Sequence, residues 1–322
     1  MRNKLIAVLG LGYWGTIVTK TLVSLKLFNK IYIYDVDYNK VNIIKKKFKE
    51  KVSYMKFKQI LDNKNINNIF LATPPKNNYH LLNKLVDAKK NILIEKPGLI
   101  SLNHYKNIKK KIKKNKTKLT FGYIYIYNNY IRFIKKIVNL KKLGEIRYIN
   151  FQRQNFGPIR NKISSIFDLA THDLSILHFL FNKKIVLKKI IKHDILNKKN
   201  FDISILNLIV GKTKVDINVS WLNPEKIRKI IIIGSKKMLL FDEMNSVSPI
   251  KIYNNYVNFP KIDNFTKSYF NQSKYIYKGS SKSIRLKDKK PLDEEIRSFV
   301  KNKKSITDIN FSEKIIKIIS KK

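Results

Sequence analysis

The sequence predicts a two-domain α/β protein, with a doubly wound parallel sheet at the N-terminus and an α+β domain with an open, mainly antiparallel sheet after it. Three observations predict this class. Apolar runs alternate with helical patterns up to about residue 125, strand-like runs then follow one another directly, and a glycine-rich turn follows the first apolar run. A boundary near residue 120 gives domains of residues 1–120 and 121–322.

The first domain is predicted from strict alternation of strands and helices. Its expected helices are 16–27, a lysine-rich segment ending at 51, 59–65, 79–88 and 104–116. Its expected strands are 5–9, 31–34, 52–57, 66–72, 91–94 and 117–125. Alternation of this kind produces parallel sheets, which bind ligands at the carboxyl ends of their strands.

The second domain is predicted from successive strands, which imply antiparallel pairing. A helix over 166–181 interrupts them, and helices opening at Pro291 and Ser312 are expected to pack back near the first domain. Residues 254–290 give no interpretable pattern. The expected strands are 145–154, about 185–193, 201–210 and 212–222, a hairpin over 228–242 and a short strand at 250–254.

The glycine-rich turn has G-x-G-x-x-G spacing, with Gly10, Gly12 and Gly15 between a strand and a helix. Gly10 permits the tight turn, Gly12 removes a Cβ that would block a pyrophosphate, and Gly15 lets helix and strand approach. The helix N-terminus then offers free N–H groups to the phosphates. Asp35 ends the next strand, where a carboxylate can accept from a ribose 2′-OH. The sequence therefore predicts an NAD site, with NADP as the alternative.

Composition excludes several classes of protein. The chain has no cysteine, so it forms no disulfide or thiolate metal site, and its histidine spacings suggest no other metal site. No apolar run approaches the roughly 20 residues of a membrane span, and the apolar run after Met1 is too short for a signal peptide, so we expect a cytoplasmic protein without a membrane partner. The net charge of +46 comes mostly from dispersed lysines, typical of AT-rich codon usage. We therefore expect no specific binding of nucleic acid.

Two groups of residues are candidates for proton transfer. Asp168 and His172 are four residues apart on a predicted helix, so the carboxylate can orient the imidazole and favour its protonated form. On spacing alone, a helix-capping Asp and a core His are the alternative. Lys96 follows a buried strand and precedes a proline, where partial desolvation would lower its pKa. A surface lysine in a loop is the alternative there.

Four motifs together resemble the Gfo/Idh/MocA oxidoreductases, the family of glucose-fructose oxidoreductase and inositol dehydrogenase. They are the glycine turn 10–15, Ala72-Thr-Pro-Pro75, Glu95-Lys-Pro97 and Asp168-x-x-x-His172. The resemblance implies a Rossmann domain, a C-terminal α/β domain whose open sheet mediates homo-oligomerisation, and hydride transfer with a sugar or cyclitol hydroxyl. Asn78 and Ala170 depart from the family's usual His and Gly.

The resemblance also assigns residues to roles. It implies that Lys96, Asp168 and His172 are catalytic, in place of the structural alternatives above. The cofactor-binding residues that it adds to the three glycines and Asp35 are Tyr13, Trp14, Thr73, Pro74, Glu95 and Lys96.

The arginines predict the class of substrate. Only eight of the 68 basic residues are arginines, and four of these lie between residues 132 and 160. A retained arginine suggests that its planar fork is needed, as in bidentate recognition of phosphate or carboxylate. This region also resembles sugar-nucleotide 3-dehydrogenases of the family. We therefore expect a nucleotide sugar such as a UDP-N-acetylglucosamine derivative, against a free sugar or inositol, or a non-catalytic NAD-binding regulator. The residues expected to bind the substrate are Tyr123, Tyr127, Arg153, Asn155 and Arg160.

Overall fold

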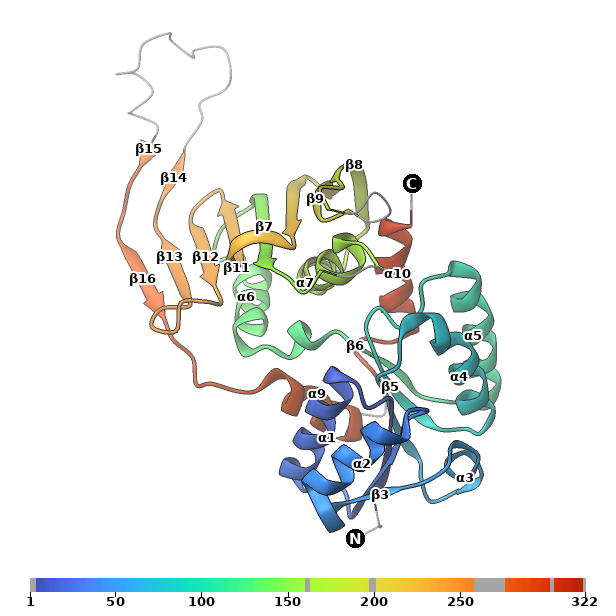
Figure 1. Ribbon diagram of the computed structural model, residues 1–322. Coiled ribbons are helices and arrows are strands. Elements are labelled where there is room, and N and C mark those ends of the chain that lie inside the picture. The colour runs from blue at the N-terminus through green and yellow to red at the C-terminus, as the bar shows by residue number, and fades with distance from the viewer. Residues whose placement is uncertain (1–3, 160–162, 197–200, 258–275, 302–303, 321–322) are drawn as a thin grey trace. The chain divides into compact units, whose positions relative to one another are not determined.

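The computed structural model describes residues 4–159, 163–196, 201–257, 276–301 and 304–320. The chain forms two compact units (Figure 1). Unit 1 consists of Met1–Tyr127 and Lys289–Lys322, and unit 2 is Asn128–Asp288. The chain thus passes from unit 1 to unit 2 after residue 127, and its C-terminal residues belong to unit 1.

Unit 1 is built on a six-stranded parallel sheet with the order β3-β2-β1-β4-β5-β6. The order reverses between β1 and β4, and in open sheets of this kind the carboxyl ends of the strands at the reversal bind ligands. The strands are β1 (Leu5–Leu9), β2 (Lys30–Tyr34), β3 (Val52–Tyr54), β4 (Asn68–Leu71), β5 (Asn91–Glu95) and β6 (Leu119–Gly122).

Helices connect these strands and cover the sheet (Figure 1). Two of them come from the C-terminal part of the chain. The helices are α1 (Tyr13–Leu25), α2 (Tyr38–Phe48), α3 (Phe57–Asp62), α4 (Pro75–Asp87), α5 (Leu102–Asn115), α9 (Pro291–Lys301) and α10 (Ile309–Ile319), with 3-10 turns η1 (Lys49–Lys51) and η2 (Ile124–Tyr127).

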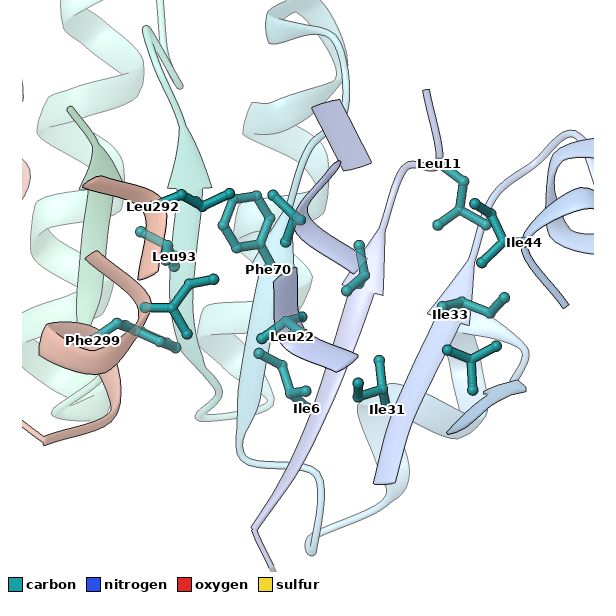
Figure 2. Close-up of a cluster of buried hydrophobic side chains, with 14 of the residues drawn as sticks. Ile6, Leu11, Leu22, Ile31, Ile33, Ile44, Phe70, Leu93, Leu292 and Phe299 are labelled. Atoms are coloured by element: carbon teal, nitrogen blue, oxygen red, sulfur yellow. The ribbon is translucent and has the colours of Figure 1, made fainter. Parts of the chain in front are cut away.

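The C-terminal helices complete the core of unit 1. Leu292, Ile296 and Phe299 recur at helical spacing on α9 and join a buried cluster with residues of β1, β2 and α1 (Figure 2). On α10, Ser312 Oγ lies 2.7 Å from the Tyr105 hydroxyl and 3.0 Å from the Tyr123 hydroxyl. Residues nearly 300 positions apart in the sequence thus share one core.

Unit 2 contains an eight-stranded mixed sheet with the order β16-β13-β12-β11-β7-β10-β9-β8. Among the described strands of this sheet only β7 and β10 pair in parallel, so the sheet is mainly antiparallel, as predicted. Its strands are β7 (Ile146–Phe156), β8 (Ile185–His193), β9 (Ile203–Val210), β10 (Thr213–Ser220), β11 (Leu222–Gly234), β12 (Met238–Asp242), β13 (Ile250–Tyr253) and β16 (Ser281–Ile284), and a separate pair is formed by β14 (Tyr256–Val257) and β15 (Ile276–Tyr277).

Helices α6 (Asn129–Asn139) and α7 (Thr171–Phe181) lie together on one face of this sheet (Figure 1). Directly before α7, Ile166–Ala170 form a π-helical turn, η3. The sequence predicted one uniform helix over 166–181 and missed α6 altogether, although Asn128 caps α6 by accepting from the Tyr130 and Ile131 N–H groups. The strand predicted over 117–125 ends at Gly122 and gives way to η2.

Candidate active site

The glycine turn joins β1 to α1 in unit 1 and has the geometry that its spacing predicts. Gly10 has φ +91°, a region that favours glycine. A Cβ on Gly15 would lie 1.9 Å from the Gly10 carbonyl oxygen, so only glycine permits the helix to approach the turn this closely. A Cβ on Gly12 would meet nothing within 4 Å. No packing within the described residues explains a glycine at position 12, whereas a bound pyrophosphate would.

Asp35 follows β2 and is tied to the glycine turn by its carboxylate. The Leu11 N–H donates to Asp35 Oδ2 at 2.6 Å, and the Asp37 N–H donates to Asp35 Oδ1 at 2.9 Å. These two bonds fix the carboxylate beside the turn and leave it half-exposed. A carboxylate held here can accept from a ribose hydroxyl and repels a phosphate on the same ribose.

The residues of the turn fit a dinucleotide. Among the described residues no side chain caps the N-terminus of α1, so its first N–H groups are available to an anion at the positive end of the helix dipole. Tyr13 in the first turn is 85 % exposed, and Trp14 packs against the core cluster that contains Ile296. Gly12 leaves the approach open.

Two further turns stand at the carboxyl ends of β4 and β5, and a buried Asn78 connects them. The Thr73 hydroxyl donates to Asn78 Oδ1 at 2.6 Å, and Asn78 Nδ2 donates to the Gly98 carbonyl at 2.8 Å. Asn78, the departure noted in the sequence, therefore bridges the turn that carries Thr73 and the exposed Pro74 to the one that carries Lys96.

Glu95 and Lys96 are half-buried at the end of β5, where Glu95 pairs with Gly122 of β6. A Cβ on Gly122 would lie 3.0 Å from Glu95 Oε2. The Glu95 side chain therefore lies against the end of β6, while Lys96 begins the turn after β5. Both residues lie at the carboxyl edge of the parallel sheet.

Asp168 and His172 lie in unit 2, across the junction between η3 and α7. Asp168 lies in the π-helical turn, His172 lies in the first turn of α7, and both are half-buried. Trp221, which is fully buried, donates its indole N–H to Asp168 Oδ2 at 3.3 Å. Single π-helical turns inside helices are frequent at functional sites. Sequence reasoning predicted neither the π turn nor the tryptophan contact.

The structure does not support the predicted role of Arg153 in binding the substrate. Its guanidinium lies in a buried ion pair with Asp173, with Nη2 to Oδ1 at 2.7 Å and Nε to each carboxylate oxygen at 3.0 Å. The residue is 4 % exposed and Asp173 is 2 % exposed. Its surroundings therefore do not support the predicted contact with a substrate phosphate, because the planar fork is occupied by a carboxylate of α7.

Asn155 lies at the end of β7 and is held on both sides. Its Nδ2 donates to the Gly157 carbonyl, and its Oδ1 accepts from Arg228 Nη2 at 2.5 Å. Arg228 of β11 lies directly opposite Arg153 in the sheet, and sequence reasoning missed it. Arg160 lies outside the described residues.

Tyr123 and Tyr127, both expected to bind substrate, are buried in unit 1. Burial raises the pKa of the Tyr123 hydroxyl, and the nearby Glu95 carboxylate raises it further. Its hydroxyl lies beside Ser312 Oγ and its ring 5.5 Å from that of Phe311, which indicates a packing role for Tyr123.

A buried carboxyl was also missed by sequence reasoning. Glu295 of α9 has no exposed surface, and neither of its oxygens has a hydrogen-bond partner within the described residues. Burial raises the pKa of Glu295 well above its usual value, and the charge of Glu95 adds to this effect. Burial therefore favours the protonated, uncharged form of Glu295.

Among the described residues, no group of three or more His, Asp or Glu side chains could hold a metal ion. None of the described helices combines the length and the apolar character that crossing a membrane requires.

Comparisons with known proteins agree with this geometry. Residues 4–123 match a family described as "Oxidoreductase family, NAD-binding Rossmann fold", GFO_IDH_MocA. No curated protein sequence matches the chain.

Solved structures resemble almost the whole chain. UDP-N-acetylglucosamine 3-dehydrogenase GnnA from Acidithiobacillus ferrooxidans has a TM-score of 0.79 at 15% identity, over 98% of this chain and 95% of that one. A Desulfitobacterium hafniense protein assigned as an NADPH-dependent oxidoreductase has a TM-score of 0.82 at 15% identity, over 99% and 94%. GenD2 from gentamicin A biosynthesis, in complex with NAD, has a TM-score of 0.77 at 12% identity, over 99% and 93%. At these identities the likeness concerns the fold. Together with the family match, it supports an NAD-binding Rossmann fold in residues 4–123.

Proposed function

We propose that this protein is an NAD-dependent dehydrogenase that transfers a hydride between the nicotinamide and a secondary hydroxyl carbon of a sugar. The observation that carries the proposal is the glycine turn, where Asp35 holds the Leu11 N–H, Gly12 leaves open space and α1 begins without a side-chain cap. This combination suits an NAD pyrophosphate together with its ribose. NADP is the alternative, and the anchored carboxylate of Asp35 disfavours it.

We assign catalysis to Lys96, Asp168 and His172, as the resemblance implies. Bound NAD would supply the acceptor for the hydride. His172 would take the proton of the substrate hydroxyl as general base. Asp168 would stabilise the imidazolium that results, and Lys96 would assist in the proton transfer.

The test of this assignment is the turnover of His172→Ala and Lys96→Ala. We expect each to lower turnover by on the order of a hundredfold or more while NAD affinity is nearly unchanged. Asp168→Asn should also be damaging because it removes the charge that favours the imidazolium. Wild-type turnover in His172→Ala would mean that His172 is a core histidine.

For the substrate we propose a nucleotide-linked sugar, with a free sugar or inositol as the second candidate. The support is the fold likeness to a UDP-N-acetylglucosamine 3-dehydrogenase and the strong positive charge of the chain. Since Arg153 is committed to Asp173, Arg160 is the remaining predicted arginine for a phosphate. The deciding assay is NAD reduction with UDP-N-acetylglucosamine, its uronic acid, myo-inositol and glucose, repeated with Arg160→Lys. Activity confined to the uncharged compounds would refute the nucleotide sugar.

We also propose that the protein is a cytoplasmic homo-oligomer. In unit 2 the residues that alternate with the buried ones form a second, less covered face of the sheet. On it the half-buried Ile231 and Ile233 of β11 lie directly opposite Leu240 and Met238 of β12. Apolar side chains of this kind favour association with a second copy. Light scattering after gel filtration would test this, and a monomeric mass at micromolar concentration would refute it.

A further inference from the structure

The segment that carries Asp168 and His172 has an irregular backbone and two buried attachments to the sheet of unit 2. Asp168 belongs to the π-helical turn, whereas His172 and Asp173 belong to the first turn of α7. Asp168 and His172 are half-buried, but Asp173 is 2 % exposed. His172 therefore lies between two aspartates, one four residues before it and one directly after it.

The first attachment is the ion pair between Asp173 and Arg153. Arg153 lies on β7, which is paired on both sides by β10 and β11, so the guanidinium projects from the interior of the sheet. It meets the carboxylate with three N–O distances between 2.7 and 3.0 Å. Two donors on one planar group fix both the position and the orientation of the carboxylate, which a lysine ammonium does not.

The second attachment is the bond from Trp221 to Asp168. The indole has one N–H and no acceptor, and its ring is fully buried. The backbone of Trp221 is fixed as well, since its N–H donates to the Asp202 carbonyl at 3.1 Å and its carbonyl accepts from the Gly157 N–H at 2.8 Å. The donor therefore reaches Asp168 Oδ2 from a rigid site between β10 and β11.

We infer that Arg153 and Trp221 are positioning residues, which hold the η3–α7 junction at the sheet and so fix the place and orientation of His172. The inference rests on the proposed function, in which His172 is the general base. It also gives Arg153 a role that its burial permits, in place of contact with the substrate. Neither side chain has to touch the substrate to act in this way.

The kinetic test compares substitutions in matched pairs. Arg153→Lys keeps the charge but loses the fork, and Arg147→Lys is its control, because Arg147 is an exposed arginine of the same strand, β7. Trp221→Phe removes one N–H donor to an aspartate. Its control is Tyr148→Phe, which removes the hydroxyl that donates to Asp216 at 2.7 Å in the same sheet.

For Arg153→Lys and Trp221→Phe we expect kcat to fall by between about tenfold and a hundredfold, because small displacements of a catalytic group have effects of this size. The KM for the substrate should change by less than about twofold. The two controls should keep wild-type kcat. A raised KM at unchanged kcat in Arg153→Lys would overturn the inference, since it would mean that Arg153 contacts the substrate.

A spectroscopic test separates this inference from the proposed function. The chain has two tryptophans, so an NMR spectrum shows two indole N–H resonances, and Trp221→Phe assigns them. In Asp168→Ala we expect the Trp221 resonance to shift and its hydrogen exchange to accelerate, with that of Trp14 unmoved. If the Trp221 resonance does not move in Asp168→Ala, Trp221 is not attached to Asp168, even if the wild-type protein is an active dehydrogenase. If the Trp221 resonance shifts in Asp168→Ala but the wild-type protein has no dehydrogenase activity, the attachment is supported and the proposed function is refuted.

Discussion

Replacing Gly12 or Gly15 by alanine should have opposite consequences, although both glycines belong to one turn. At Gly15 the added Cβ would lie 1.9 Å from the Gly10 carbonyl oxygen, whereas real Cβ atoms do not come within 3.0 Å of such an atom. The carbonyl and α1 would have to separate by roughly an ångström, and overpacking of this kind costs about 1–3 kcal/mol of unfolding free energy or more. Gly15→Ala should therefore be destabilised before any cofactor is added.

At Gly12 the backbone has φ −66° and the Cβ would meet nothing within 4 Å, so alanine fits the protein itself. Alanine lowers the entropy of the unfolded chain, which stabilises the fold, but it is a poorer helix cap than glycine, which destabilises it. Because the two effects oppose each other, the unfolding free energy should change by no more than about 1 kcal/mol. NAD affinity, in contrast, should fall at least about tenfold, equivalent to about 1.4 kcal/mol, because the methyl group occupies the path of the pyrophosphate.

The assays are urea unfolding of the cofactor-free protein and calorimetric titration with NAD, each applied to both variants. The expected pattern is a stable Gly12→Ala that binds NAD poorly and a destabilised Gly15→Ala. If Gly12→Ala binds NAD as tightly as the wild type, the pyrophosphate does not pass this turn. If Gly15→Ala unfolds at the wild-type urea concentration, the turn is not packed against α1 as described.

Three further predictions concern other residues. Asp35→Ser should reduce the preference for NAD over NADP by about tenfold or more, since it removes the charge that repels a 2′-phosphate, and an unchanged ratio of affinities would contradict this. Asn78→Ala should raise the KM for NAD and lower the melting temperature, because Thr73 and Gly98 both lose a buried partner, and melting and kinetic curves that superimpose on the wild type would argue against the bridge. Glu295 keeps its proton in the folded state above pH 4.5, where the unfolded chain loses it, so its burial lowers stability progressively as pH rises toward the raised pKa. Glu295→Gln cannot titrate, and its melting temperature relative to the wild type should therefore increase between pH 5 and pH 8, whereas parallel curves would mean that Glu295 is ionised in the fold.

The sequence predicted the positions of those candidate site residues that directly follow a strand. The glycine turn, Asp35 and the turn at Glu95 and Lys96 each follow an apolar strand directly, and a parallel sheet brings the ends of such strands to one edge. Their placement in unit 1 was therefore predictable. The alternation of strands and helices also identified the sheet of unit 1 and the change to antiparallel pairing in unit 2.

Contacts between distant residues could not be predicted in the same way. Nothing near Trp221 in the sequence indicates Asp168, which lies 53 residues earlier. Leu292, Ile296 and Phe299 show the spacing of an amphipathic helix, but that spacing does not say which sheet the helix covers. The hydroxyl of Tyr123 lies beside that of Ser312, which is 189 residues away in the sequence. Each of these contacts depends on the tertiary fold.

The arginines show how a sound physical argument can lead to the wrong partner. In a chain where lysine replaces most arginine, a retained arginine indicates several acceptors in one plane. This holds for Arg153, whose fork meets both oxygens of Asp173, and for Arg228, which donates to the Gln154 and Ile227 carbonyls and to Asn155 Oδ1. These acceptors are groups of the protein itself. At Arg153 and Arg228 the retained arginine therefore marks a position where several hydrogen bonds fix the geometry, whereas the exposed Arg147 makes a single bond to the Val257 carbonyl.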